Sequence, residues 1–288
     1  MEPRVVVDHP YRLGENPLWH PVEQRLYWTD ITGQGVYRLD ASGAPETVFE
    51  GETVGGFTFQ ADGSLLLFMA HGKIAVLSAD GSIRAVHESL PDEAAARFND
   101  VIADPEGRVF CGTMPFERGP HGALYRLDLD GSIVKLVEGV TISNGLGFTP
   151  ALDGLYYVDT PTQRIDLFDY DRATGAIVNR RVFADTASDD GHPDGMTVDA
   201  EGYVWCARWD GWSCIRYGAD GRPTQRIDFP ARKVSSVAFG GADYATMYFT
   251  TAGRPTDAEE DNGAAGGRVF ALEAGVKGRP EFLSRILL

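Results

Sequence analysis

The stretches Arg25-Leu-Tyr-Trp-Thr-Asp30 and Gly35-Val-Tyr-Arg-Leu-Asp40 lie close together near the start of the chain, and Ser42-Gly43 follows them. Their β-branched and aromatic side chains favour strands, and the glycine favours a tight turn because it tolerates a positive φ. Similar pairs of runs span residues 64–68 and 73–77, 108–112 and 123–128, 155–159 and 164–168, 203–207 and 214–217, and 246–250 and 268–272. Six units spaced by about 40–50 residues indicate the blades of a β-propeller.

The repeat predicts an all-β chain that folds as a six-bladed β-propeller with four antiparallel strands in each blade. Six units use all 288 residues, so residues 1–288 are expected to form one domain. No stretch carries the apolar stripe of a long helix, which disfavours doubly wound and barrel α/β folds. Because an open ring would expose strand edges, we expect N- and C-terminal strands to close it. In this scheme Arg4–Val7 is the outer strand of the last blade, beside residues 281–288.

The chain is strongly acidic, with 42 Asp and Glu residues against 26 Lys and Arg residues and a formal net charge of −16. Such a charge repels phosphates and anionic lipids, so neither a nucleic acid nor a membrane is an expected partner. No apolar run approaches the roughly 18 residues of a membrane helix, and three valines near the N-terminus are too few for a signal-peptide core. The three cysteines lack C-x-x-C spacing and are expected to be buried thiols. A cytoplasmic protein is the expectation.

Several polar side chains lie where the innermost strand of a blade would begin. They are Glu15, Arg97, Asn99, Asp100, Glu117, Asn144 and Asp194. In a propeller the loops that enter the inner strands converge on one mouth of the central channel, so distant residues can meet there. Two carboxylates and an amide form an oxygen ligand set suited to Ca²⁺, Mg²⁺ or Mn²⁺. A structural interpretation stays open as well, since Asn-Gly and Asp-Gly are common turns and Arg97 can pair with Asp100.

Sequence motifs for other common chemistries are absent. The chain has no G-x-S-x-G elbow, no H-E-x-x-H zinc motif and no glycine–lysine phosphate loop. Its six histidines are scattered, which disfavours a histidine-rich metal site. A hydrolase on this chain would therefore work without a serine nucleophile of the elbow type.

In these same segments the chain resembles the gluconolactonase, regucalcin (senescence marker protein) and luciferin-regenerating-enzyme family. The matching stretches include Leu13-Gly-Glu-Asn-Pro-Leu-Trp19, Arg97-Phe-Asn-Asp100, Ile142-Ser-Asn-Gly145, Tyr157-Val-Asp-Thr160, His192-Pro-Asp-Gly195 and Thr250-Thr-Ala252. Their order and spacing extend over nearly the whole chain, which makes the resemblance specific. It implies a six-bladed propeller that holds one divalent metal ion in its channel.

The resemblance also implies a role for each candidate side chain. The metal ligands would be Glu15, Asn144 and Asp194. The side chains at the substrate would be Arg97, Asn99 and Glu117. The residues before Glu117, Pro115-Phe116, depart from the acidic or small residues that the family has there. Trp209 and Trp212 would border the mouth of the channel.

Such a ligand set suits the hydrolysis of a cyclic ester. The expected enzyme is a divalent-metal-dependent sugar lactonase, which opens an aldonolactone such as glucono-, xylono-, arabinono- or galactonolactone. Asp194 is expected to ligate the metal and to act as the general base that takes a proton from the attacking water. Ca²⁺ is the first expectation for the metal, and Zn²⁺, Mn²⁺, Mg²⁺ and Fe²⁺ stay open. The expected partner is the small sugar lactone alone, bound by a monomer or a weak homo-oligomer.

Three other functions stay open at this point. A regucalcin-like protein would bind calcium without physiological catalysis. An aryl or phosphate esterase on the same propeller would need an apolar channel mouth in place of Arg97 and Asn99. An interaction scaffold would present a large apolar patch on one face.

Overall fold

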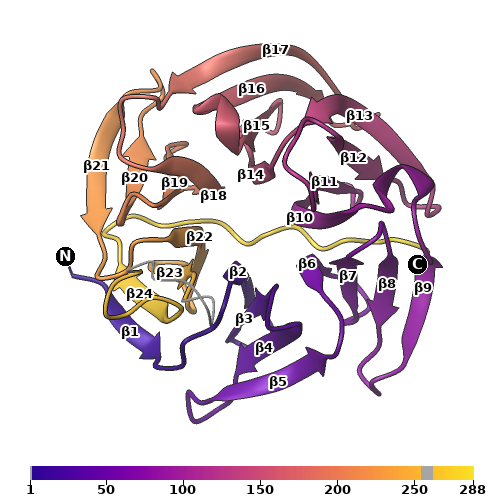
Figure 1. Ribbon diagram of the computed structural model, residues 1–288, viewed down its shortest axis with the longest axis horizontal. Helices are drawn as coiled ribbons and strands as arrows, with labels where there is room; N and C mark the ends of the chain where they lie inside the picture. Colours follow the sequence, from indigo (N-terminus) through magenta and orange to yellow (C-terminus); the bar gives the residue numbers. More distant parts are fainter. Residues whose placement is uncertain (1, 254–261) are drawn as a thin grey trace.

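Each repeat unit of the sequence folds into one antiparallel sheet, and the six sheets are arranged as blades around a common axis (Figure 1). The computed structural model describes residues 2–253 and 262–288. Within these residues, 24 strands form six sheets of four strands each, so the predicted propeller is confirmed. The described part contains two helices, the short 3-10 turns η1 (Pro91–Glu93) and η2 (Thr160–Thr162), neither of which could span a membrane.

The first five blades follow the chain in order, each from its inner strand to its outer strand. Blade 1 consists of β2 (Gly14–His20), β3 (Arg25–Asp30), β4 (Gly35–Leu39) and β5 (Pro45–Glu50). Blade 2 consists of β6 (Val54–Phe59), β7 (Leu65–Met69), β8 (Ile74–Leu77) and β9 (Ile83–His87). Blade 3 consists of β10 (Ala96–Ala103), β11 (Val109–Pro115), β12 (Gly122–Leu127) and β13 (Ile133–Val140).

The remaining blades complete the ring. Blade 4 consists of β14 (Ser143–Phe148), β15 (Gly154–Asp159), β16 (Arg164–Asp171) and β17 (Ala176–Asp185). Blade 5 consists of β18 (His192–Val198), β19 (Val204–Trp209), β20 (Ser213–Tyr217) and β21 (Pro223–Asp228). Blade 6 consists of β22 (Val234–Gly240), β23 (Thr246–Thr251), β24 (Val269–Glu273) and, from the N-terminus, β1 (Arg4–Val7).

The strand β1 is the outer strand of the last blade, as predicted, but its neighbour differs from the prediction. β1 pairs with β24 through Arg4 opposite Ala271 and Val5 opposite Phe270. The prediction that residues 281–288 lie beside β1 is wrong. Because β24 and β1 already complete the fourth sheet position, the chain beyond β24 has no edge left to join in that blade.

Residues 277–288 instead cross the end of the ring, and we call this segment the strap (Figure 1). Its backbone bonds to blade 5 through Lys277 O, to blade 2 through Ser284 N and to blade 3 through Arg285 N and Leu287 N. Ile286 is fully buried in the core between blades 2 and 3. The apolar residues of this segment therefore mark a packed crossing segment rather than a strand.

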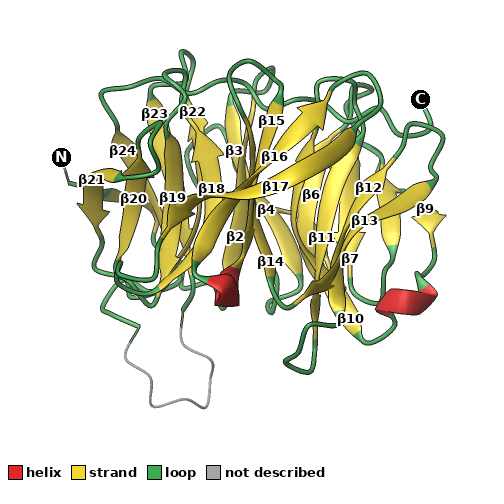
Figure 2. Cartoon of the chain, turned by 90° about the horizontal axis from the view of Figure 1, so that it is seen from above, coloured by secondary structure: helices red, strands yellow, loops and turns green. Residues whose placement is uncertain are grey.

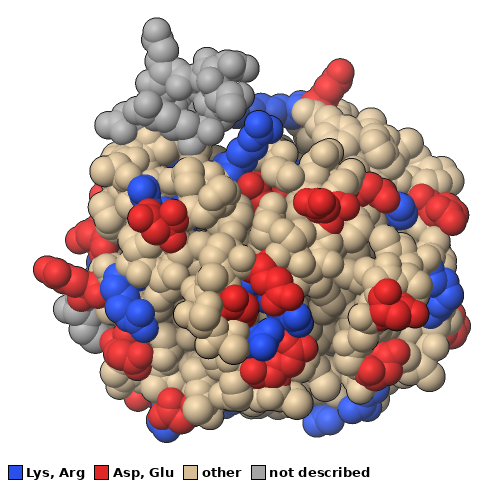
Figure 3. All heavy atoms as spheres, turned by 90° about the horizontal axis from the view of Figure 1, so that it is seen from below, with Lys and Arg blue, Asp and Glu red and all other residues tan. Residues whose placement is uncertain are grey.

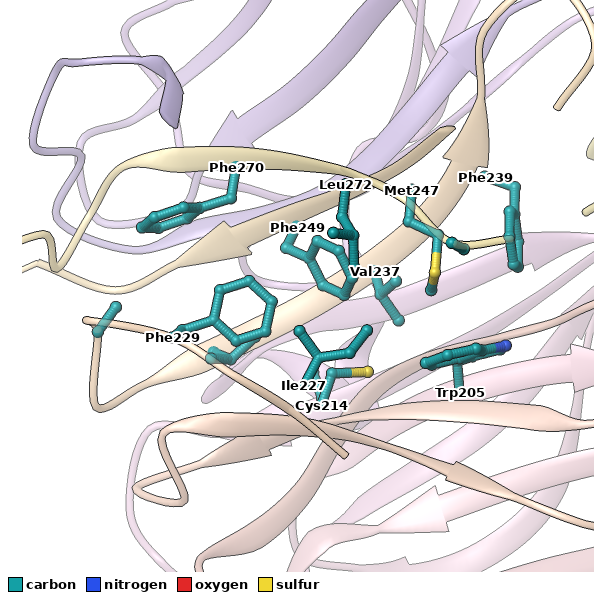
Figure 4. Packing of buried hydrophobic residues seen from close by; sticks show 14 of the residues in the cluster. Trp205, Cys214, Ile227, Phe229, Val237, Phe239, Met247, Phe249, Phe270 and Leu272 are labelled. Atoms are coloured by element: carbon teal, nitrogen blue, oxygen red, sulfur yellow. The ribbon is translucent and has the colours of Figure 1, made fainter. Parts of the chain in front are cut away.

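The hydrophobic core is divided among the interfaces between neighbouring blades. Each of six buried clusters combines residues of two adjacent blades. In the cluster of Figure 4, Trp205 and Cys214 of blade 5 pack against Met247, Phe249 and Phe270 of blade 6. All three cysteines are buried free thiols, as expected. Since every interface buries apolar area, the ring is held together all the way round.

The Asp-Gly turns connect strands as the sequence indicates. At the turn between β8 and β9, the Asp80 carboxylate accepts the backbone N–H of Ser82 at 2.9 Å, and Gly81 adopts a φ of +83°. Such a positive φ is cheap only for glycine, so these turns fix where each outer hairpin reverses.

On the face drawn in Figure 3, acidic and basic side chains are interspersed rather than gathered by sign. Large exposed apolar side chains, such as Val22, Phe116 and Val178, come from different blades. These three residues do not form a single apolar patch of the kind that a scaffold protein needs.

Candidate active site

The inner strands of all six blades are irregular at the same position. The strand register shifts between Glu15 and Leu18 in β2, Val54 and Gly56 in β6, Phe98 and Val101 in β10, Asn144 and Leu146 in β14, Pro193 and Met196 in β18, and Val234 and Ser236 in β22. A β-bulge bends its strand and redirects the side chains around it. The six bulges therefore form one ring around the axis of the propeller.

Four polar side chains lie at this ring of bulges, each on a different blade. They are Glu15 on β2, Asn99 on β10, Asn144 on β14 and Asp194 on β18. All four are almost completely buried, with exposed fractions of 3–4%. Glycines allow the strands to approach closely here, since a Cβ at Gly145 would lie 2.7 Å from the carbonyl oxygen of Asp194. The structure thus places four of the predicted site residues around one point.

A chain of hydrogen bonds fixes the two amides. The Asn99 Nδ2 donates to Asn144 Oδ1 at 2.8 Å, and Asn144 Nδ2 donates to Thr160 Oγ1 at 2.8 Å. Thr160 Oγ1 in turn donates to the carbonyl oxygen of Pro193 at 2.9 Å. At the other end, the Arg97 guanidinium donates to Asn99 Oδ1. The network spans blades 3, 4 and 5, so it holds the amide oxygens in a fixed orientation.

The two carboxylates are incompletely paired. Glu15 Oε2 and Asp194 Oδ1 are buried and have no hydrogen-bond partner among the described residues. Burial raises the pKa of Glu15 well above its ordinary value, and the nearby charge of Asp194 raises it further. Burial also raises the pKa of Asp194, and Asp100 adds to this effect. Two buried carboxylates that each leave one oxygen atom without a partner are costly, and a further positive charge beside Arg97 would offset this cost.

A bound cation fits this donor set. Glu15, Asp194 and the amide of Asn144 offer oxygen atoms only, the ligand type of hard divalent ions. Within the described part of the chain, no three His, Cys, Asp or Glu side chains gather as a metal site. The candidate site has only two carboxylates, and its third donor is the Asn144 amide. A divalent cation would bind the two carboxylate oxygens that have no hydrogen-bond partner among the described residues.

A cavity of about 250 Å³, which we call the main cavity, opens over these residues. Its lining comprises Leu13, Glu15, Arg97, Asn99, Met114, Arg118, Ile142, Asn144, Thr160, Asp194 and Trp209. Small-molecule pockets typically measure about 300–1,000 Å³, so this one suits a compact ligand such as a monosaccharide. Both 3-10 helices lie at the same face of the ring (Figure 2), and η2 brings Thr160 into the main cavity.

Two of the predicted neighbours do not reach the main cavity. Glu117 is exposed on the loop between β11 and β12, and the next residue, Arg118, lines the cavity in its place. Trp212 is also outside the lining, whereas Trp209 is part of it. Asp100 faces a separate small space of about 60 Å³ together with Glu281 and Phe282 of the strap. Arg97 therefore bonds to Asn99 and to Met114 Sδ at 3.3 Å rather than to Asp100.

Comparison with known proteins identifies the family. A family model described as "SMP-30/Gluconolactonase/LRE-like region" matches residues 13–253. The chain belongs to this family. The pentonolactonase XacC of Haloferax volcanii is 44% identical over 289 residues, which cover 98% of each chain. Regucalcin of Xenopus laevis is 37% identical over 283 residues, which cover 95% of each chain.

Solved structures agree with this assignment to the SMP-30/gluconolactonase family. The crystal structure of a calcium-binding protein, regucalcin, from Agrobacterium tumefaciens superposes with a TM-score of 0.91 at 29% identity. The superposition covers 99% of this chain and 97% of that chain. The family resemblance of the sequence motifs is thereby confirmed, and so is the six-bladed propeller.

Sequence reasoning missed Arg208, a fully buried residue of this SMP-30 family chain that supports the Asp194 strand. The Arg208 guanidinium donates to the carbonyl oxygens of Asp190 at 3.0 Å, Gly191 at 3.0 Å and Thr186 at 3.3 Å. It therefore holds the loop that leads into β18. Only an arginine in an otherwise apolar inner-blade run, Val204 to Trp209, hinted at such a role.

Proposed function

We propose that this protein is a divalent-metal-dependent hydrolase that opens a sugar lactone to its aldonic acid. The observation that carries the proposal is the pair of buried, unpartnered oxygens Glu15 Oε2 and Asp194 Oδ1 at the bottom of the main cavity. The family assignment supports the proposal, since a relative that is similar over its whole length is named a pentonolactonase.

Glu15, Asn144 and Asp194 are the residues that would hold the cation. When bound, the cation supplies Lewis-acid polarisation of the ester carbonyl and keeps the two carboxylates ionised. Ca²⁺ is the first candidate by ligand chemistry, with Zn²⁺, Mn²⁺, Mg²⁺ and Fe²⁺ as the alternatives.

Asp194 is the candidate general base. Its carboxylate takes a proton from water while the water oxygen attacks the lactone carbonyl carbon. The ring C–O bond then breaks, and the proton passes to the ring oxygen that leaves, so one hydroxy acid is formed. Because both fragments stay joined in the product, the site has to accommodate only one small molecule throughout.

Arg97 and Asn99 are the candidate substrate-binding residues. The Arg97 guanidinium has donors beyond the one it gives to Asn99, and these can bind sugar hydroxyl groups. Trp209, Met114 and Ile142 add apolar surface on which the carbon face of a sugar ring can lie. Glu117 keeps a role only if its loop brings it nearer to bound substrate.

Calcium binding without catalysis is the second candidate, favoured by the regucalcin relatives. An aryl or phosphate esterase fits less well, because Arg97 and Asn99 make the bottom of the cavity polar.

We further propose that the protein is cytoplasmic and is a monomer or a weak homo-oligomer. This location and this state suit an enzyme whose substrate is a small neutral or anionic metabolite.

The test is an aldonolactone panel with chelated protein. Xylono-, arabinono-, glucono- and galactonolactone are supplied, and each candidate metal is restored in turn. We expect turnover only with metal, and we expect Glu15→Gln to reduce kcat/KM at least about 100-fold at saturating metal. Glu88→Gln, which alters an exposed glutamate outside the main cavity, serves as the matched control. Metal binding without turnover on any lactone would leave the calcium-binding function and end the lactonase proposal.

A further inference from the structure

A second cavity of about 250 Å³ adjoins the main cavity, and we call it the side cavity. Its lining comprises Arg12, Leu13, Thr32, Trp209, Lys233, Ala252 and Gly253. Leu13 and Trp209 line both cavities, so the two cavities are neighbours on either side of these residues. None of Glu15, Asn144 and Asp194 is part of the side cavity lining. A substituent of a ligand in the main cavity would have to pass Leu13 and Trp209 to reach the side cavity.

The described linings of the two cavities carry more positive than negative side chains. The cations are Arg12, Arg97, Arg118 and Lys233, and the carboxylates are Glu15 and Asp194. A divalent cation would neutralise Glu15 and Asp194, and the Asp100 carboxylate, whose charge acts on Arg97 from outside the linings, offsets that guanidinium. Arg12 and Arg118 then remain as the cations of the linings that no described carboxylate pairs with. On a chain with a formal net charge of −16, such a local excess is the reverse of the average. Clefts lined by one sign of charge attract ligands of the other sign.

Two of these cations are already engaged within the protein. Arg97 donates to Asn99 and approaches Met114 Sδ. The Lys233 ammonium lies 5.0 Å from the ring centroid of Trp209, and Lys233 as a residue is buried. These two side chains shape the walls of the cavities, so their charge is partly used inside the protein.

Arg12 and Arg118 differ from the other two. Both are exposed, and within residues 2–253 and 262–288 neither side chain forms an ion pair or hydrogen bond. Several other exposed arginines of this acidic chain do pair, as Arg181 does with Asp169 and Arg226 with Asp228. The two arginines at the cavities are thus available to an anion from solution.

We propose that this site selects lactones that carry an anionic group away from the ester, bound by Arg118 and Arg12. The inference rests on the proposed lactonase function. The anion is a carboxylate, a phosphate or a sulfonate, since the guanidinium fork binds two oxygen atoms of each. Hydrolysis creates the new carboxylate of the product among Glu15, Asn144 and Asp194, which line the main cavity. Arg12 lines the side cavity, so Arg12 would bind a substituent of the substrate rather than this new carboxylate.

The test compares lactones that differ only in this group. D-Glucaro-1,4-lactone carries a carboxylate where D-glucono-1,4-lactone carries a CH₂OH, and 6-phosphoglucono-1,5-lactone is compared with glucono-1,5-lactone. For the wild-type holoenzyme we expect kcat/KM to favour the anionic member of at least one pair by about tenfold. The pair with the larger anionic-to-neutral ratio of kcat/KM shows whether the site prefers a carboxylate or a phosphate.

Variants then assign the preference to the two arginines. Arg118→Gln and Arg12→Gln should each reduce the anionic-to-neutral ratio, and the double variant should bring it close to one. Arg84→Gln, which alters an exposed arginine on β9 outside both cavities, should leave the ratio at its wild-type value. The ratio is internal to each variant, so a general loss of folded protein does not change it.

Three outcomes decide between the possibilities. If the holoenzyme opens none of the four lactones, the anion preference is refuted, and the proposed function fails as well only if the xylono-, arabinono- and galactonolactones are not opened either. If it opens the neutral lactones at least as well as the anionic ones, the lactonase stands and the anion preference is refuted. A preference that persists in the double variant refutes the assignment to Arg118 and Arg12.

Discussion

The inner strands of blades 1, 3, 4 and 5 differ from those of blades 2 and 6 in one respect. All six are bulged at the same height, but only the first group presents Glu15, Asn99, Asn144 and Asp194 there. At the bulge, β6 has Gly55 and β22 has Ser235. The backbone repeat therefore creates six equivalent positions, and the side chain at each position decides whether the position belongs to the candidate site or to the contacts between blades.

The two remaining positions serve the contacts between blades. A Cβ at Gly55 would lie 1.8 Å from the carbonyl oxygen of Phe98, so β6 and β10 can approach each other only through a glycine. Ser235 Oγ donates to the carbonyl oxygen of Gly14 at 2.5 Å, which ties blade 6 to blade 1 beside Glu15. Packing at these two positions holds the strands that carry Glu15 and Asn99.

The largest expected effect is on catalysis, at Asp194. Asp194→Ala removes the candidate base and a cation ligand, so we expect lactone turnover to fall at least about 1,000-fold, or roughly 4 kcal/mol of transition-state stabilisation. In chelated protein the same change removes a buried carboxylate whose Oδ1 has no partner among the described residues. The thermal midpoint without metal should therefore equal or exceed that of the wild type.

Turnover by steady-state kinetics and thermal midpoint by scanning calorimetry check this pair of expectations. Turnover within tenfold of the wild type would remove Asp194 from the mechanism. A lower midpoint in the chelated variant would mean that Asp194 holds the fold together, as Ser235 is expected to do.

The six blades and most of the candidate site residues were predictable from the sequence. The Asp-Gly turns and β-rich runs predict the blades, since turn chemistry and strand propensity are local properties. Glu15, Asn144 and Asp194 could be placed together because equivalent strands of a propeller converge on one axis. Thr160 lies in a stretch that the family resemblance already included, Tyr157 to Thr160, yet its hydrogen bond to Asn144 needed the structure.

The strap and the Glu117 loop could not be placed in this way. The apolar residues 281–288 look like a strand in sequence, and only the completed sheet order of blade 6 shows that no edge is free for them. The conformation of the loop between β11 and β12 decides whether Glu117 or Arg118 lines the main cavity. A periodic sequence pattern does not predict which of two neighbouring loop residues faces a cavity.

The next largest effect is expected on stability, at Gly55. Gly55→Ala forces its Cβ against the backbone of Phe98, which cannot move like a flexible side chain. We expect the free energy of unfolding to fall by about 3 kcal/mol or more, with a partial loss of turnover because β10 also carries Asn99. Urea unfolding monitored by tryptophan fluorescence measures the change.

Gly43→Ala is the matched control for this substitution. Gly43 has a φ of +83° and no atom within 4 Å of an added Cβ, so only backbone strain of about 1 kcal/mol is expected. Equal losses in the two variants would mean that strand approach at Gly55 contributes nothing of its own.

The smallest effect is expected at Ser235, the blade 6 counterpart of Asp194. Ser235→Ala leaves the buried carbonyl oxygen of Gly14 without this donor, which should cost about 1–2 kcal/mol of stability. Because Ser235 lies outside the lining of the main cavity, kcat/KM at saturating metal should stay within about threefold of the wild type. Ser235→Ala should therefore lose stability and keep its turnover, whereas Asp194→Ala should lose turnover and keep its stability. A loss of turnover near that of Asp194→Ala would mean that the bulge of blade 6 also contributes to turnover, which would remove the distinction between the two groups of blades.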